Sequence, residues 1–128
     1  MQGRRVLIVE DDPILALDLQ VILEEATDGA AEVLLASSVD AARRALAGPG
    51  LDAVLLDVDV RDGKTFGLAA LLRAQGTPFA FVSGSRRDEV PAALRDAPFL
   101  PKPYEPGEVE RVVLAALSSP AATAPQPG

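Results

Sequence analysis

The sequence predicts an α/β fold in which five helices cover both faces of a doubly wound, five-stranded parallel sheet. Short apolar runs alternate with segments of helical periodicity along most of the chain, and 48% of the 128 residues are hydrophobic. Strands that alternate with helices are typical of parallel sheets with both faces covered. A chain of this length suits one compact domain, which we expect over residues 1–118.

The first half of the chain supplies three strands and two helices. RVLIVE, between Arg4 and Glu10, is predicted as a buried strand. PILALDLQVILEEA has apolar residues at i, i+4, i+7, i+8 and i+11, which indicates an amphipathic helix with Asp12 as its N-cap and Pro13 at its first position. AEVLLA and DAVLLD are further strands. The helix between them begins at SSVD, which resembles a capping box, and ends at Gly-Pro-Gly.

The second half supplies the remaining elements. FGLAALLRAQG is predicted as a helix that Gly76 and Pro78 terminate, and FAFVS is the fourth strand. RRDEVPAALRDA is predicted as a short helix with Pro91 near its start. FLP is a fifth strand and GEVERVVLAAL a final amphipathic helix. The ending SSPAATAPQPG has three prolines and no apolar period, so we expect residues 119–128 to form a disordered Pro/Ala-rich tail.

Right-handed crossovers close such a sheet naturally in the flavodoxin-like order 2-1-3-4-5. In open α/β sheets the functional crevice lies at the carboxyl ends of the strands. We therefore expect residues that are distant in the sequence to meet at the carboxyl ends of the strands. The strand ends are Glu10, Asp11 and Asp12 after the first strand, Asp57 after the third, Ser83 at the fourth and Lys102 after the fifth.

Composition excludes several kinds of chemistry. The chain has no cysteine and no histidine, which excludes disulfides, thiolate catalysis, Cys or His metal sites, a Ser-His-Asp triad and a phosphohistidine within the chain. A formal charge of −7 argues against binding to nucleic-acid phosphates. Apolar runs fall well short of the roughly 20 residues of a membrane helix. We therefore expect a cytoplasmic protein with no nucleic-acid or membrane partner.

The clustered carboxylates point to a cation and to phosphoryl chemistry. Carboxylates packed together repel each other, and a cation relieves the repulsion. Oxygen ligands without His or Cys suit Mg²⁺ or Mn²⁺. An Asp beside such a metal can attack a phosphoryl group and form an aspartyl phosphate, and a lysine and a hydroxyl nearby would complete the neutralisation of charge.

Four short motifs, in this order, resemble the receiver domain of bacterial two-component response regulators. They are VLIVEDD, AVLLD, FVSG and PKP, and the resemblance extends over roughly residues 4–118. No single motif is specific, but all four lie at predicted strand ends. The resemblance implies a phosphoprotein in a phosphorelay and a requirement for Mg²⁺ (or Mn²⁺).

The resemblance also implies a role for each residue of the site. Asp57 would be the phosphoacceptor and would bind the metal together with Glu10 and Asp11. Asp59 would offer its backbone carbonyl to the metal. The remaining matches are the switch hydroxyl of Ser83, the lysine Lys102 that pairs with the phosphoryl group, the rotating switch aromatic Phe99, and a cis peptide bond between Lys102 and Pro103.

The chain departs from the family in two places. FVSGSR loosely resembles the Phe-Ala-Thr-Gly-x-Tyr subgroup of stand-alone alphaproteobacterial receivers, with Val82, Ser83 and Arg86 replacing Ala, Thr and Tyr. Arg61 and Thr65 stand where the family commonly has proline and glycine, so we expect the loop VDVRDGK to differ in shape.

We expect a single-domain response regulator that accepts a phosphoryl group on Asp57 from a sensor histidine kinase or a histidine phosphotransfer protein. It would not be an enzyme, would lose its phosphoryl group slowly, and would signal through a protein surface around strands four and five. An unknown protein target would bind that surface.

Three other interpretations stay open. AVLLDVDV also resembles the first motif of haloacid-dehalogenase-type phosphohydrolases, with Asp57 as nucleophile and Asp59 as general acid. The fold could also serve as an interaction module that is independent of phosphorylation. Without the family resemblance, Asp59 and Asp62 are turn residues and Phe99 is a core residue.

Overall fold

A five-stranded parallel sheet forms the centre of the computed structural model, which describes residues 4–48 and 50–118. The strand order is β2-β1-β3-β6-β7, which confirms the predicted order 2-1-3-4-5 because β4 (Asp59–Val60) and β5 (Gly63–Lys64) form a separate hairpin. Every neighbouring pair is parallel, so the carboxyl ends of the strands meet at one edge. The strands are β1 (Arg4–Val9), β2 (Ala31–Ala36), β3 (Ala53–Leu56), β6 (Phe79–Ser83) and β7 (Phe99–Pro101).

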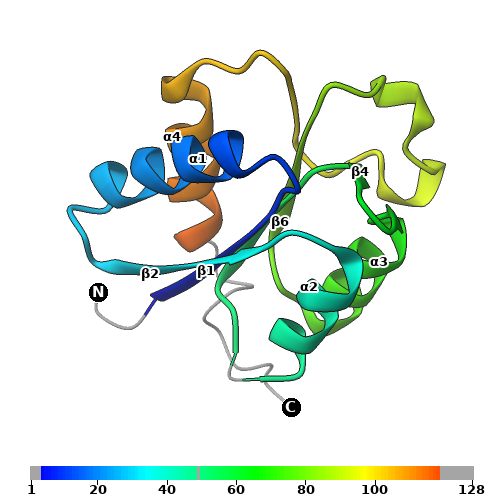
Figure 1. Ribbon diagram of the computed structural model, residues 1–128, viewed down its shortest axis with the longest axis horizontal. Coiled ribbons are helices and arrows are strands. Elements are labelled where there is room, and N and C mark those ends of the chain that lie inside the picture. Colours follow the sequence, from blue (N-terminus) through cyan, green and yellow to red (C-terminus); the bar gives the residue numbers. More distant parts are fainter. Residues whose placement is uncertain (1–3, 49, 119–128) are drawn as a thin grey trace.

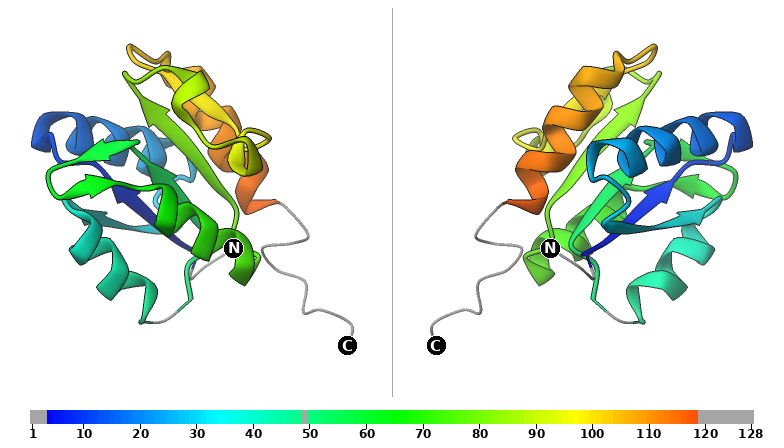
Figure 2. Two further views of the ribbon diagram at one scale, coloured as in Figure 1. Left: turned by 90° about the vertical axis from the view of Figure 1, so that its right-hand side faces the viewer. Right: turned by 90° about the vertical axis from the view of Figure 1, so that its left-hand side faces the viewer.

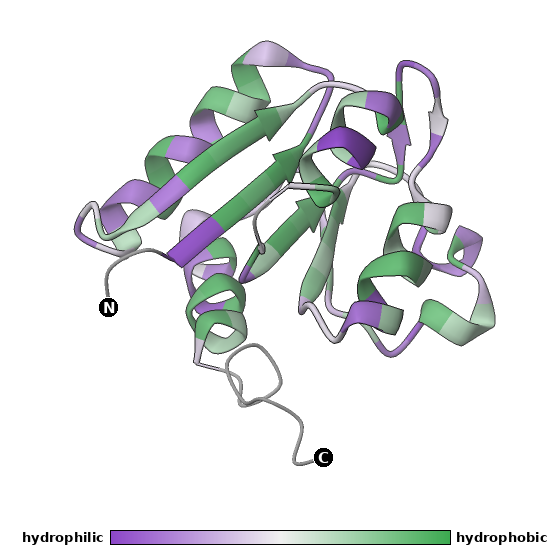
Figure 3. Ribbon diagram, turned by 90° about the horizontal axis from the view of Figure 1, so that it is seen from below, coloured by the Kyte–Doolittle hydropathy of each residue, from purple (hydrophilic) through white to green (hydrophobic). Residues whose placement is uncertain are grey.

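Helices cover both faces of this sheet (Figures 1 and 2). Val6 and Ile8 of β1 pack with α1 and α4, whereas Leu7 and Val9 face the side of α2 and α3. Burial on both faces explains why the strands are apolar without alternation, and Figure 3 shows them hydrophobic along most of their length. The helices are α1 (Pro13–Ala26), α2 (Val39–Leu46), α3 (Phe66–Gln75) and α4 (Pro106–Leu117).

Local polar contacts fix the helix ends where the sequence predicts them. The Asp12 carboxylate accepts a hydrogen bond from the N–H of Ile14 at 2.9 Å, which confirms Asp12 as the N-cap of α1. Ser38 caps α2 by accepting from the N–H of Ala41 at 3.0 Å. Helix α3 ends at Gly76, whose φ of 76° lies in the left-handed region that glycine adopts without strain.

The prediction of a helix between β6 and β7 is wrong. Residues 84–98, called the 84–98 segment below, instead contain two 3₁₀ helices, Arg87–Glu89 and Ala92–Leu94. Pro91 separates them, because proline has no N–H to donate and disfavours helical backbone at the preceding residue. That residue, Val90, is extended, with φ −72° and ψ 130°.

Arg95 holds the 84–98 segment in this shape. Its guanidinium donates to the carbonyl of Val90 at 2.7 Å and to the carbonyl of Asp88 at 3.0 Å. These carbonyls would have been bonded within a continuous helix, and the arginine satisfies them instead. In the described ranges the sheet is therefore covered by four α-helices rather than five.

A short antiparallel hairpin lies between β3 and α3, where the sequence predicts only a loop of unusual shape. It consists of β4 (Asp59–Val60) and β5 (Gly63–Lys64). Gly63, with φ 141°, makes the turn possible. The Asp62 carboxylate accepts from the N–H groups of Val39 at 2.6 Å and Asp40 at 3.1 Å, so the turn is attached to the start of α2.

The expected tail, residues 119–128, lies outside the described residues. Within residues 4–48 and 50–118, none of the helices combines the length and the apolar character that crossing a membrane requires.

Candidate functional site

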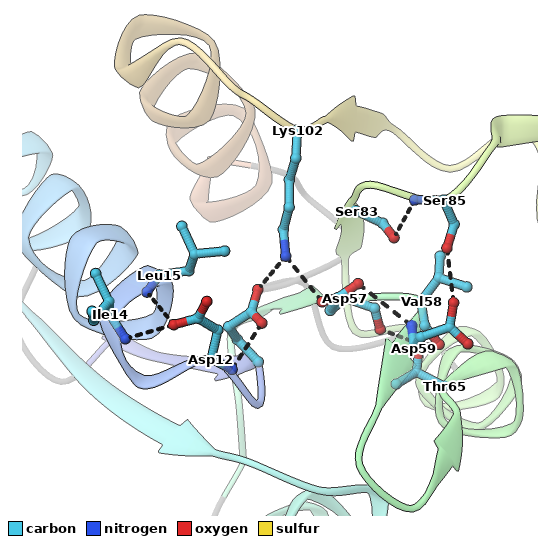
Figure 4. A network of polar contacts seen from close by, with 11 residues as sticks. Asp12, Ile14, Leu15, Asp57, Val58, Asp59, Thr65, Ser83, Ser85 and Lys102 are labelled. Atoms are coloured by element: carbon cyan, nitrogen blue, oxygen red, sulfur yellow. Dashed lines mark hydrogen bonds and ion pairs between the residues drawn. The ribbon is translucent and has the colours of Figure 1, made fainter.

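The carboxyl edge of the sheet brings together side chains that are far apart in the sequence (Figure 4). Glu10 directly follows β1, and Asp57 directly follows β3. Ser83 is the last residue of β6, and Lys102 directly follows β7. The parallel strands thus place all four of these residues at the same edge.

Lys102 joins two of these strand ends. Its Nζ donates to Glu10 Oε1 at 2.7 Å and to Asp57 Oδ2 at 3.0 Å. Both carboxylates are buried, with Glu10 3% and Asp57 8% exposed, and the Lys102 side chain is 19% exposed. A buried carboxylate needs a partner of opposite charge, and here one ammonium serves two of them.

The burial of these groups shifts their pKa values. Burial raises the pKa of Glu10, and the charge of Asp57 adds to this rise, whereas hydrogen bonds from Lys102 and from the N–H of Asp12 oppose it. For Lys102, burial lowers the pKa, but hydrogen bonds to the two carboxylates outweigh burial and raise it above its ordinary value. The ammonium is therefore held in its charged form. A further cation near Glu10 would favour the carboxylate there.

Glu10, Asp11 and Asp57 form an acidic cluster. Each offers a carboxylate oxygen, and these oxygens all lie within 4.8 Å of one another. Hard oxygen donors of this kind suit Mg²⁺ or Mn²⁺ rather than softer metals, and three carboxylates exceed the single charge of Lys102. The residues present therefore fit a divalent cation. Asp12 does not belong to this cluster, because its carboxylate caps α1.

The side chain of Asp59 lies at the rim of the site. It forms an ion pair with Lys64 Nζ at 2.6 Å and accepts a hydrogen bond from Ser85 Oγ at 2.8 Å. The Lys64 hydrogen bond, and after it the Ser85 one, lowers the pKa of Asp59. These contacts fasten the hairpin to the start of the 84–98 segment. The role expected for the Asp59 backbone carbonyl stays a prediction.

Three neighbours of the site were not among the site residues predicted from the sequence. They are Lys64, Ser85 and Thr65. Thr65 is fully buried, and its Oγ1 donates to the backbone carbonyl of Asp57 at 2.6 Å, which fixes the backbone that presents the carboxylate. The signal for Thr65 was its departure from the family's glycine. Lys64 and Ser85 are polar loop residues, and nothing in their sequence context distinguishes them.

Ser83 and Phe99 lie where the resemblance implies the two parts of a switch. Ser83 is 1% exposed, and its hydroxyl accepts from the N–H of Ser85 at 3.0 Å. Phe99 is partly buried, with its ring centroid 6.2 Å from that of Phe81. The peptide bond between Lys102 and Pro103 is cis, as the resemblance implies. The switch roles themselves stay predictions.

Among known proteins, the similarities are found in solved structures. No family model and no curated protein matches the chain. The non-phosphorylated HemR receiver domain of Leptospira biflexa is 26% identical, with a TM-score of 0.76 over 91% of this chain and 96% of that one. A response regulator receiver domain protein of Methanospirillum hungatei is 25% identical, with a TM-score of 0.75 over 89% and 93%.

A third structure was solved with a ligand. The response regulator TrrA of Thermotoga maritima, in complex with Mg²⁺-BeF, is 18% identical and has a TM-score of 0.74 over 90% of this chain and all of that one. At this identity the likeness concerns the fold. In its fold, its strand order and the motifs at the carboxyl edge of its sheet, the chain resembles the receiver domains of response regulators.

Proposed function

We propose that the chain is a response regulator receiver that accepts a phosphoryl group on Asp57 from a phosphohistidine of a sensor kinase or a phosphotransfer protein. The observation that supports this most is the contact of Lys102 with both Glu10 and Asp57 at the sheet edge. It joins three strand ends into one charged site, and an ammonium beside the Asp57 carboxylate is the kind of group that phosphoryl transfer requires.

The transfer is a displacement at phosphorus. One carboxylate oxygen of Asp57 forms the new P–O bond, the P–N bond to the donor imidazole breaks, and the imidazole leaves with its electron pair. Thr65 supports the nucleophile by holding the Asp57 backbone. Lys102 Nζ lies 3.0 Å from Asp57 Oδ2. Its ammonium can therefore pair first with the carboxylate and then with the phosphoryl oxygens bound to it.

The acidic cluster is the proposed place of Mg²⁺. Glu10, Asp11 and Asp57 would hold it, together with the backbone carbonyl of Asp59, and it would supply positive charge against the phosphoryl oxygens. Three carboxylates whose oxygens lie close enough to bind one ion support the proposal. The Mg²⁺-BeF complex of the structurally similar Thermotoga maritima protein supports it as well.

The phosphohistidine has to come from a donor domain outside this sequence, because its 128 residues contain no histidine. Helix α1 offers a surface for one beside the site. Ile14, Leu17 and Val21 are 77%, 58% and 42% exposed, and their i, i+3, i+7 spacing places them on one face of the helix. An exposed apolar stripe of this kind is typical of protein contacts.

The contacts of Asp59 count against the phosphohydrolase alternative. A general acid for that reaction needs a carboxyl group that holds a proton near neutral pH. Lys64 and Ser85 instead lower the pKa of Asp59 and engage its two oxygens. Hydrolysis of the aspartyl phosphate would need a base that activates water beside Asp57, and both Asp59 oxygens are instead engaged by Lys64 and Ser85. A receiver without such a base would keep its phosphoryl group for longer, as the family resemblance implies.

Phosphorylation and turnover, measured together, test the proposal. Incubation with Mg²⁺ and acetyl phosphate should add one phosphoryl group to the intact mass, and Asp57→Asn should abolish the addition. Asp28→Asn, a change in an exposed turn at the other edge of the sheet, is the matched control and should behave like wild type. The adduct should survive rapid desalting, and phosphate monoesters should not be turned over.

Two results would contradict the proposal. Fast turnover of a monoester that Asp59→Asn abolishes would identify a phosphohydrolase. No adduct with acetyl phosphate or with a phosphorylated phosphotransfer protein would favour an interaction module that is independent of phosphorylation.

A further inference from the structure

A cavity lies at the amino ends of the central strands, at the end of the sheet opposite to Asp57. Its volume is about 640 Å³, and it is bounded by the starts of β3 and β6, the turn after α3, residues 96–98 and the last turns of α4. Small-molecule sites in proteins typically measure roughly 300–1,000 Å³ and are mostly apolar with a few polar groups. The site at Asp57 uses none of the residues that line this cavity.

The cavity exists because β7, the outermost strand of the sheet, is short. β7 pairs only with the last three residues of β6, so Phe79 and Ala80 have no strand beside them on that side. Pro98, just before β7, has no N–H with which to extend the ladder. Gly76 and Ala97 also line the cavity and are too small to fill it.

The polar lining of the cavity has an excess of positive charge. Arg73 is already engaged, because it forms an ion pair with Asp96 at 2.8 Å, donates to the carbonyl of Ala93 at 2.9 Å and lies over the ring of Phe79. Arg111, on α4, is exposed and has no hydrogen bond or ion pair among residues 4–48 and 50–118. One guanidinium beside an apolar hollow is thus left without a counter-charge, in a chain whose formal charge is −7.

We propose that this cavity binds an amphipathic organic carboxylate, with its apolar body in the hollow and its carboxylate at Arg111. The apolar walls, which include Phe79, Ala80 and Val112, would remove the ligand's hydrocarbon from water. The guanidinium would bind the carboxylate through charge-assisted hydrogen bonds. The site does not depend on phosphorylation, because it lies at the other edge of the sheet from Asp57.

A titration of the full chain with decanoate, followed by backbone amide shifts in NMR spectra, tests the proposal. Saturable shifts are expected at Gly76, Ala97 and Ala115, with little change near Asp57. Decanol, which has the same chain length and no charge, should bind about tenfold more weakly. Acetate, which has the charge without the hydrocarbon, should not bind. The Asp57→Asn variant should bind decanoate like wild type, which separates this result from the test of phosphoryl acceptance.

Two variants and a control complete the test. Arg111→Gln should weaken decanoate binding about tenfold and leave decanol binding unchanged. Ala115→Phe, which adds a ring to the cavity from an exposed helix position, should abolish binding of both. Arg43→Gln, at an exposed arginine of α2, should change neither. Absence of saturable shifts at the cavity, equal binding of decanoate and decanol, or binding that survives Ala115→Phe would each overturn the proposal.

Discussion

Lys102 is the residue that connects the separate strand ends into one site. Its ammonium contacts the carboxylates of Glu10 and Asp57, which come from β1 and β3. Both carboxylates are almost completely buried. Loss of this single cation would leave two buried negative charges facing each other, so Lys102 matters for stability as well as for the proposed chemistry.

The chain has only two lysines, which makes a matched comparison possible. Lys102→Met is expected to lower the free energy of unfolding by about 3 kcal/mol in the absence of Mg²⁺, because buried carboxylates lose their partner. Lys64→Met should have little effect, because its ion pair with Asp59 is exposed. Urea unfolding of both variants measures this. Equal losses of stability would contradict the importance of the Lys102 contacts.

Asp11 is the acidic residue whose proposed role depends most directly on the metal. A cation that binds only the folded state should stabilise it by about 1.4 kcal/mol at roughly ten times its Kd, or about 5 °C in Tm for a domain of this size. Millimolar Mg²⁺ should therefore raise the Tm of the wild type, and Asp11→Asn should remove most of the increase. An equal increase in both proteins would contradict the role of Asp11 in the acidic cluster.

At the scale of elements, the β4–β5 hairpin connects the site to its surroundings. Asp59 joins it to Ser85 at the start of the 84–98 segment, and Asp62 joins it to the first N–H groups of α2. Thr65, at its end, holds the backbone of Asp57. A change at Asp57 therefore has direct contacts through which it can reach two other elements.

The contact between Asp62 and α2 predicts a pH dependence. Hydrogen bonds from the N–H groups of Val39 and Asp40 lower the pKa of Asp62 below its usual 3.8. Because the folded pKa is the lower one, the stabilisation is present above pH 3.8 and is lost as the pH falls through the folded pKa. Asp62→Ala should thus lower the Tm at neutral pH, and its difference from wild type should shrink below pH 3.8.

Thermal unfolding across this pH range measures the effect. Glu110→Ala, at an exposed acidic residue of α4, is the control and should show no such dependence. A difference between Asp62→Ala and wild type that stays constant down to low pH would show that the Asp62 carboxylate does not stabilise α2 through its charge.

Local patterns predicted most elements because local contacts determine them. Asp12, Ser38 and Gly76 end or begin helices through contacts within a few residues. The prediction of a helix in the 84–98 segment is wrong because a proline and the side-chain contacts of one arginine, both inside the segment, decide its shape. Its apolar spacing resembles a helix, but Pro91 interrupts it and Arg95 bonds the carbonyls that a helix would use.

At the scale of the whole molecule, the topology could be predicted and the contacts could not. Parallel strands bring Glu10, Asp57, Ser83 and Lys102 to one edge whatever the details of packing. The sequence does not determine which carboxylate Lys102 contacts, because that depends on side-chain positions across strands. The contacts of Lys64 and Ser85 with Asp59 were missed for the same reason. These contacts depend on the β4–β5 hairpin, whose strands have two residues each and so leave no recognisable pattern in the sequence.

The chain has chemically different regions at the two edges of its sheet. The carboxyl edge bears the acidic cluster and Lys102, whereas the amino edge bears an apolar cavity with Arg73 and Arg111. The proposed phosphoryl acceptance and the proposed carboxylate binding can therefore be tested independently in one protein.

The most direct test of the central claim is to map the phosphorylated residue. Borohydride reduces an acyl phosphate to an alcohol, so an aspartyl phosphate becomes homoserine and the modified position can be found in a digested peptide by mass spectrometry. After incubation with Mg²⁺ and acetyl phosphate, we expect homoserine at position 57 alone, and none without Mg²⁺ or in Asp57→Asn. Homoserine at position 11 or 59, or none at position 57 while the intact protein gains a phosphoryl group, would contradict the assignment of Asp57 as the phosphoacceptor.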